Sequence, residues 1–425
     1  MIGTNVDQKA SVVLMGHIGI YSSEWDQDFF LGVPYALPPT ATKYAAACVG
    51  YGSDHDSYSN VSEDCLYLNI VRPSSSVRPG SERLPVVVWI HGGALNEGSA
   101  NDLRYNLTFI VDRSVKIDKP IIAVSINYRL SIWGFITGNE AIHSGNANLG
   151  LKDQRLALKW VKENIGYFGG NTSQITIWGE SAGAFSVGAH LTAYGSRDDN
   201  LFHGAIMQPG SPLYYGSIRD WNKTAYNIVS EGMSCNTMDG GLQCLREVSF
   251  EKRNSFITET GLTQAGLWQP VVDGDFIQGH ASEQLADGAF VRVPIITGAN
   301  SDEGTAVVNG TLFDATLDNE EKTDEYSYIA PWLSARETNT LKFLESTFPR
   351  VISNPIDVQK LTIYSISYSP PFPPAISRQS GTSTEMKKFL HTDRMLNGIL
   401  PPSRTEIAVW RTPTTAMQPS MPRVV

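Results

Sequence analysis

The chain contains the segment QITIWGESAG at residues 174–183, in which a strand pattern changes into a helix pattern. The β-branched residues before Gly179 predict a buried strand, and the small residues at 182–189 predict a closely packed helix. Between them stands Gly-x-Ser-x-Gly, centred on Ser181. A serine on a sharp turn exposes its hydroxyl, and flanking glycines remove Cβ atoms that would clash there. The segment therefore predicts a nucleophile elbow with Ser181 as a catalytic residue, in preference to a structural Gly-rich turn.

The surrounding sequence alternates strand and helix patterns. The continuous apolar runs that predict strands buried on both faces lie at residues 86–90, 121–126, 175–178, 205–207 and 294–298. Residues 151–165 predict a helix, since Leu156, Trp160, Val161 and Ile165 recur at helical spacing. This alternation predicts an α/β protein with a mostly parallel central sheet and helices on both faces. Together with the elbow, it predicts an α/β-hydrolase fold.

Composition excludes several classes of partner. The net charge is −10 over 425 residues, and this acidic balance argues against nucleic-acid binding and against docking on anionic membranes. No apolar run of about 18 residues occurs, so no transmembrane helix is expected. Residues 1–7 lack the basic start and apolar stretch of a signal peptide. The sequence contains no Cys-x-x-Cys pair, so the cysteines give no indication of zinc or redox chemistry.

Cysteines and sequons favour an oxidising compartment. The cysteines are Cys48, Cys65, Cys235 and Cys244. Three pairings are possible, of which the local one closes two short loops. Asn-x-Ser/Thr sequons begin at Asn60, Asn106, Asn171, Asn222 and Asn309. An even cysteine count with several sequons predicts a secreted glycoprotein.

A second glycine-rich segment supports the catalytic interpretation. The residues HGGA at 91–94 directly follow the first buried strand. Small residues at that place let backbone N–H groups approach a developing oxyanion. The alternative is a plain Gly-Gly turn, but the elbow downstream favours an oxyanion loop.

Several further motifs identify a family resemblance. They are FLGVPYA at 30–36, SEDCLYLNI at 62–70, NYRL at 127–130, GNANLGLKDQ at 145–154 and FGGN at 168–171. With the elbow, these segments resemble the type-B carboxylesterase, lipase and cholinesterase family, in particular its fungal members. The resemblance covers most of residues 12–310.

The resemblance implies a role for each matching residue. Ser181 would form the acyl-enzyme, and Glu303 would be the triad acid, with the adjacent Asp302 as its rival. The oxyanion-hole N–H groups would come from Gly93, Ala94 and Ala182, although family members usually have Gly at position 94. The family disulfides would be Cys48–Cys65 and Cys235–Cys244. The implied substrate is a small-molecule or lipid carboxylic ester, and no metal or organic cofactor is implied. Lipase and short-chain esterase remain open alternatives, as does the oligomeric state.

The chain departs from the family pattern in three places. A segment that normally bears an arginine is missing between Pro39 and Cys48, and Pro209 stands where the family usually has Ser. Among eight histidines, only His391 follows Glu303, as the order of an α/β-hydrolase triad requires. The surroundings of His391 resemble a helix upstream of the family's catalytic loop.

These departures lead to an expectation about the C-terminal part. Residues 1–395 are expected to form one α/β-hydrolase domain that is C-terminally incomplete. Residues 396–425 are expected to be an atypical Pro-rich tail in a loop or disordered state. The main hypothesis is a carboxylic ester hydrolase. The alternatives are a catalytically impaired or non-catalytic interaction protein of the same fold, or a defective gene product without the triad His.

Overall fold

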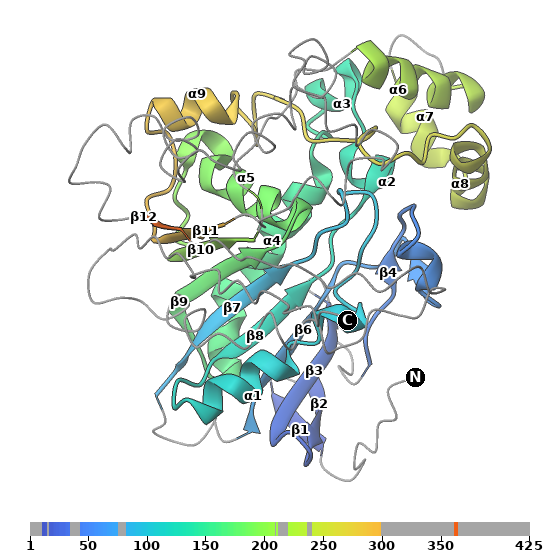
Figure 1. The fold of residues 1–425 in the computed structure, drawn as a ribbon. Helices are drawn as coiled ribbons and strands as arrows, with labels where there is room; N and C mark the ends of the chain where they lie inside the picture. The colour runs from blue at the N-terminus through green and yellow to red at the C-terminus, as the bar shows by residue number, and fades with distance from the viewer. Residues whose placement is uncertain are drawn as a thin grey trace, which may run out of the picture.

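The protein is built around one large twisted sheet (Figure 1). The computed structural model describes residues 11–14, 17–34, 43–74, 82–208, 210, 220–235, 240–298 and 361–363. The strands are β1 (Ser11–Leu14), β2 (His17–Ser22), β3 (Gln27–Pro34), β4 (Ala47–Cys48), β5 (Val61–Ser62), β6 (Tyr67–Pro73), β7 (Leu84–Ile90), β8 (Ile122–Ile126), β9 (Gly170–Gly179), β10 (Gly204–Met207), β11 (Ile295–Thr297) and β12 (Leu361–Ile363). The α-helices are α1 (Thr108–Lys116), α2 (Ser131–Phe135), α3 (Asn139–His143), α4 (Leu149–Asn164), α5 (Ala182–Ser196), α6 (Asp220–Gly232), α7 (Gly241–Glu247), α8 (Phe250–Glu259) and α9 (Ala281–Ala286).

The sheet has an antiparallel beginning and a parallel remainder. In the described part of the chain its order is β1-β2-β3-β6-β8-β7-β9-β10-β11-β12. Pairs from β1 to β8 along this order are antiparallel, whereas every pair from β8 to β12 is parallel. The five strands predicted from apolar runs are β7 to β11, so the α/β prediction is confirmed.

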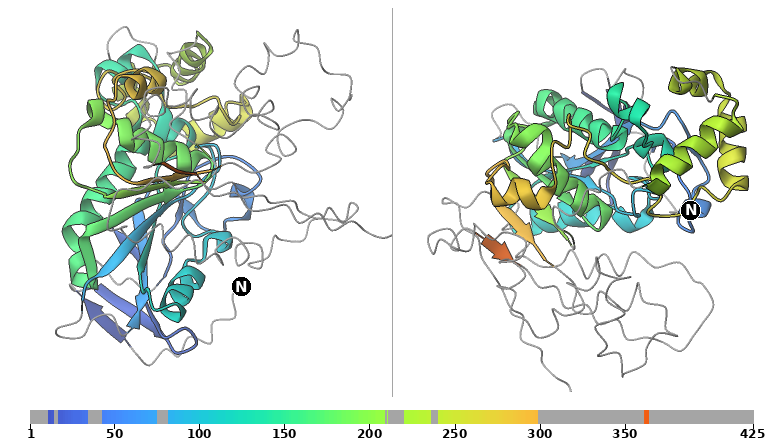
Figure 2. Two further views of the ribbon diagram at one scale, coloured as in Figure 1. Left: turned by 60° about the vertical axis from the view of Figure 1, so that its left-hand side comes forward. Right: turned by 90° about the horizontal axis from the view of Figure 1, so that it is seen from above.

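The central strand β7 faces two separate cores. Val86, Val88 and Ile90 belong to the core that includes residues of α4 and α5. Val87 and Trp89 belong to the opposite core, which includes residues of α1. This alternation follows from the two-residue repeat of a strand, and both faces are apolar because both are covered. Figure 2 shows the sheet between these helix layers.

Helix α4 confirms the predicted helix but corrects its buried face. Leu151, Leu158 and Val161 are buried, at the i, i+7 and i+10 positions of one stripe. Leu156 was expected in that stripe, yet it is 48% exposed. The reason is geometric: five residues after Leu151, a helix has turned about 140° from the buried face.

Helix α5 packs closely against the sheet because its residues are small. Ala182, Ala184, Val187 and Ala189 are all 1% exposed or less. Trp89, Trp178 and Trp268 also lie in the core, each with at most 2% of its surface exposed. No helix among the described residues is long and apolar enough to cross a membrane. The domain boundary near residue 395 and the tail at 396–425 lie outside the described residues and stay predictions.

Candidate active site

Ser181 occupies a strained turn between β9 and α5. It is the N-cap residue of α5, with φ 54° and ψ −122°, a left-handed conformation that a residue other than glycine seldom adopts. A Cβ on Gly183 would lie 2.0 Å from the carbonyl oxygen of Ile90, and a Cβ on Gly179 would lie 2.3 Å from the carbonyl carbon of Gly183. Both glycines of the motif are therefore required by close backbone approach.

The loop after β7 lies against this turn. A Cβ on Gly92 would lie 3.2 Å from the Ser181 Cβ. Gly93 and Ala94 follow with φ values of 103° and 55°, and Ala182 is the first residue of α5. Among the described residues, no group accepts a hydrogen bond from the N–H of Gly93, Ala94 or Ala182. The predicted oxyanion loop and the start of α5 thus lie next to the serine, and these three N–H groups are available to bind a ligand oxygen.

Hydrogen bonds hold the oxyanion loop in a tight turn. The N–H groups of Asn96 and Glu97 both donate to the Gly93 carbonyl, at 2.9 and 3.0 Å. The Asn96 side chain donates to the Thr263 carbonyl at 3.0 Å, and the Asn96 backbone carbonyl accepts from the Tyr51 N–H at 2.8 Å. The loop is therefore fixed from two sides before any ligand arrives, which is what an oxyanion site requires.

The histidine of the loop is structural. His91 is 1% exposed and stacks on Tyr128, with ring centroids 4.4 Å apart. The Tyr128 hydroxyl donates to the His91 carbonyl at 2.8 Å. Burial lowers the pKa of His91 to about 4, so its imidazole is neutral near pH 7. Burial raises the pKa of Tyr105, and the negative charge of the half-buried Glu180 raises it further.

Gln208 supports the elbow from the neighbouring strand. Its side-chain oxygen accepts from the Trp178 indole at 2.7 Å, and its N–H donates to the Gly179 carbonyl at 2.9 Å. Two residues on, a Cβ on Gly210 would lie 2.5 Å from the Ala184 Cβ. Sequence reasoning assigned Gln208 no role, because only the pairing of β10 with β9 reveals its position. The signal that could have pointed to it is a polar residue directly after a buried strand.

The remaining triad candidates are not placed. Glu303, Asp302 and His391 lie outside the described residues. Among the residues that are described, no histidine hydrogen-bonds the Ser181 hydroxyl. His55, His91, His190 and His203 each have a side-chain hydrogen bond to another group. No group of three metal-ligating side chains occurs within the described ranges.

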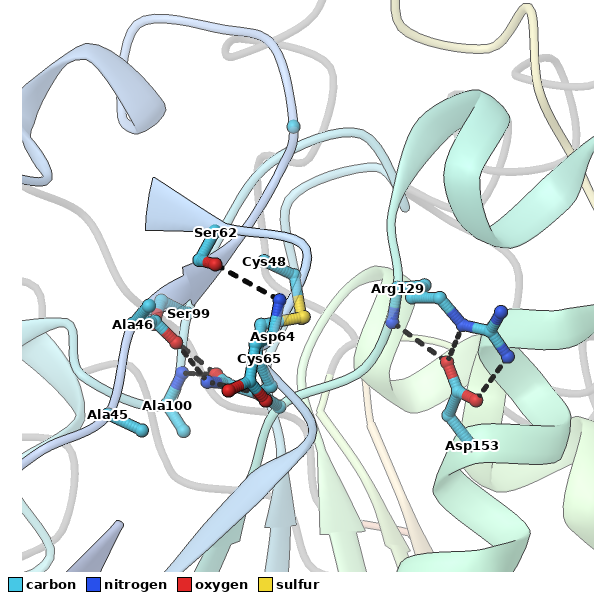
Figure 3. Close-up of a disulfide and its surroundings, with 12 residues drawn as sticks. Ala45, Ala46, Cys48, Ser62, Asp64, Cys65, Ser99, Ala100, Arg129 and Asp153 are labelled. Carbon is cyan, nitrogen blue, oxygen red and sulfur yellow. Dashed lines mark hydrogen bonds and ion pairs between the residues drawn. A yellow bond between two sulfur atoms is a disulfide. The ribbon is translucent and has the colours of Figure 1, made fainter. Parts of the chain in front are cut away.

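The structure contains the disulfides Cys48–Cys65 and Cys235–Cys244, the pairs that the resemblance implied. Figure 3 shows the first of them beside the loop after β8. In the same view Arg129 and Asp153 form a two-pronged ion pair, with N···O distances of 2.7 and 2.6 Å. This pair fastens the loop after β8 to α4.

A protein-family model matches most of the chain. The model of the carboxylesterase family matches residues 15–361. The chain belongs to the carboxylesterase family. The chain is 37% identical to "Lipase 2" of Geotrichum candidum over 309 residues, which are 69% of the chain and 53% of the lipase. It is 30% identical to a secreted triacylglycerol lipase of Gibberella zeae over 393 residues, which are 81% of the chain and 66% of that lipase.

Solved structures support the fold of this chain. EstA of Aspergillus niger matches with a TM-score of 0.58 and 30% identity, over 69% of this chain and 60% of EstA. A PNB esterase matches with a TM-score of 0.67 over 92% of this chain and 90% of the esterase. At 24% identity, the latter shows the α/β-hydrolase fold alone. The chain spans about half the length of the Geotrichum lipase that it matches.

Proposed function

We propose that the chain hydrolyses carboxylic esters through an acyl-serine intermediate on Ser181. The observation that carries the proposal is the elbow itself. Ser181 stands in a left-handed turn, and three neighbouring backbone N–H groups have no acceptor among the described residues. Such preorganised donors stabilise the negative charge that develops on a carbonyl oxygen under attack.

The chemistry has two halves. The Ser181 oxygen bonds to the ester carbonyl carbon while a base takes its proton, and the N–H groups of Gly93, Ala94 and Ala182 receive the oxyanion. The alcohol leaves with a proton, and water then attacks the acyl carbon and releases the carboxylate. We assign Glu303 as the acid that orients the base, on the resemblance alone. No cofactor enters either half.

The proposed substrates and compartment follow the relatives. Matched relatives are named lipases, and one from Rattus norvegicus is named a pyrethroid hydrolase, at 36% identity over 64% of this chain and 51% of that enzyme. On the basis of these names, we assign a small-molecule or lipid carboxylic ester as the substrate of this chain. Two relatives are named as secreted lipases, and two disulfides suit an oxidising compartment, so an extracellular protein is proposed.

One observation favours a second hypothesis, that of an impaired or non-catalytic protein or a defective gene product. Only His391 follows Glu303 in the sequence. If His391 does not reach Ser181, the chain has no base in the expected chain order, and loss of a triad member typically costs about 10⁴–10⁶ in rate.

Hydrolysis of a soluble p-nitrophenyl ester separates these hypotheses. The ester-hydrolase proposal predicts turnover that falls about 10⁴–10⁶-fold in Ser181→Ala and is unchanged in Ser282→Ala, an exposed serine on α9. A similar fall in His391→Ala would assign the base. Turnover near background in the unaltered chain, with no effect of His391→Ala, would favour the impaired protein. Equal activity in the unaltered chain and Ser181→Ala would refute the proposed nucleophile.

A further inference from the structure

A cavity of about 570 Å³ lies apart from the nucleophile elbow. It is lined by α2, α6, α7 and α8 and by residues around Cys65. None of its described lining residues belongs to the loop at 92–98 or the elbow at 179–183. Its volume falls in the range of about 300–1,000 Å³ that is usual for small-molecule sites.

Most of the cavity wall is apolar. Leu66, Ile132, Leu245 and Ile257 contribute aliphatic side chains, and Trp133 contributes an aromatic one. Water in such a place gains few hydrogen bonds, so an apolar ligand chain would displace it favourably.

The ionisable groups of the wall are mostly cationic. The described lining contains Arg129, Arg246 and Arg253 but only one carboxylate, Glu63. This excess of arginine contrasts with the whole chain, which has 33 basic and 43 acidic residues. The cavity therefore offers positive charge within an acidic protein.

The arginines differ in how far their charge is neutralised. Arg129 is paired with Asp153, as described above. Arg253 meets Glu63 at 3.3 Å, but its buried Nε has no hydrogen-bond partner among the described residues. Arg246 donates at 2.7 Å to the neutral side-chain oxygen of Asn146. Arg246 and Arg253 can thus still bind an anion.

We propose that this cavity binds an amphiphilic carboxylate, namely a free fatty-acid anion. Its alkyl chain would lie along the apolar wall, and its carboxylate would pair with Arg246 or Arg253. The guanidinium fork matches a carboxylate in shape and charge, which favours an anionic over a cationic head group. The inference does not require Ser181 to be catalytic, so it stands or falls separately from the proposed function.

Calorimetric titration of the Ser181→Ala protein with decanoate tests the proposal directly. We expect saturable binding that weakens about tenfold or more in Arg246→Gln/Arg253→Gln, because a charge-assisted hydrogen bond is lost. Decyltrimethylammonium, with the same chain length and the opposite charge, should not bind. The matched control is Arg83→Gln, which removes an exposed positive charge outside the cavity lining and should leave the affinity unchanged.

Other results would overturn the proposal. They are an absence of decanoate binding, equal binding of the cationic analogue, or an affinity that the double arginine variant does not change. The last result would also place the fatty acid elsewhere, for example beside residue 181. A second variant, Ile136→Trp, fills the cavity from a half-buried position and should abolish binding whether or not the arginine variants fold.

Discussion

The nucleophile elbow and the cavity among α2, α6, α7 and α8 differ in how tightly they are packed. At the elbow the backbones approach so closely that a Cβ on Gly183 would lie 2.0 Å from a carbonyl oxygen. The cavity leaves about 570 Å³ unfilled, between residues as distant in sequence as Val49 and Ile257. Close backbone approach imposes a short glycine motif that can be recognised in the sequence. A cavity imposes no local pattern, so only the three-dimensional structure reveals it.

The largest expected effect comes from adding one methyl group to the elbow. Gly183→Ala should lower the free energy of unfolding by about 3 kcal/mol or more, because the Ile90 carbonyl cannot move without disturbing β7. Gly145→Ala is the matched control: Gly145 also has positive φ, at 72°, but nothing lies within 4 Å of its built Cβ. Its loss should be about 1 kcal/mol, from backbone strain alone. Equal losses in urea unfolding would contradict the packing argument.

The two disulfides should stabilise the protein according to the lengths of the loops that they close. Replacing Cys48 and Cys65 by Ser should cost about 3 kcal/mol in the chain-entropy model, since the disulfide joins residues 17 apart. The same change at Cys235 and Cys244, nine residues apart, should cost about 2.5 kcal/mol. Chemical denaturation of both double variants measures these costs. Free thiols in the unaltered protein, or crossed pairs in non-reducing peptide maps, would refute the assignment.

The two regions should also respond differently to pH. The folded-state pKa of His91 is lowered to about 4, while an unfolded histidine titrates near about 6.5. The stability that His91 contributes is therefore complete above about pH 6.5 and is lost as the pH falls towards about 4, by up to about 1.4 kcal/mol per unit. The described cavity lining contains no histidine.

Urea unfolding of variants between pH 7.5 and 5 checks this. His91→Gln should reduce the pH dependence relative to the unaltered protein. An unchanged slope in His91→Gln would show that His91 is not held neutral by burial.

The smallest expected effect concerns the residue that departs from the family in the oxyanion loop. Ala94 has φ 55°, so Ala94→Gly should raise stability by about 1 kcal/mol through relief of strain. Ala265→Gly, at an exposed position without positive φ, should have the opposite sign. Thermal or urea unfolding measures both. A loss of stability in Ala94→Gly would mean that the loop adopts another conformation.

Much of the parallel half of the sheet was predictable, because strands buried on both faces are continuous apolar runs. The antiparallel strands β1, β2, β3 and β6 were not predicted, and only parts of β3 and β6 lie within the family motifs. Leu156 was assigned to the wrong face because four apolar residues at helical spacing do not fix which side is buried. Gln208 and the cavity arginines depend on contacts between distant segments, which one sequence does not reveal.

For the site, the sequence predicted the backbone elements better than the side-chain constellation. Ser181, Gly93, Ala94 and Ala182 come together because strand ends and a helix start place them there. Glu303 and His391 remain predictions, since each depends on a loop conformation that residue spacing does not specify.

Covalent labelling can show whether Ser181 is the nucleophile. The protein is treated with a fluorophosphonate probe, digested, and mapped by mass spectrometry. We expect one labelled peptide, modified at Ser181, and no label in Ser181→Ala under conditions where Ser282→Ala is labelled normally. Label that persists in Ser181→Ala, or that maps to another residue in the unaltered chain, would show that Ser181 is not the nucleophile.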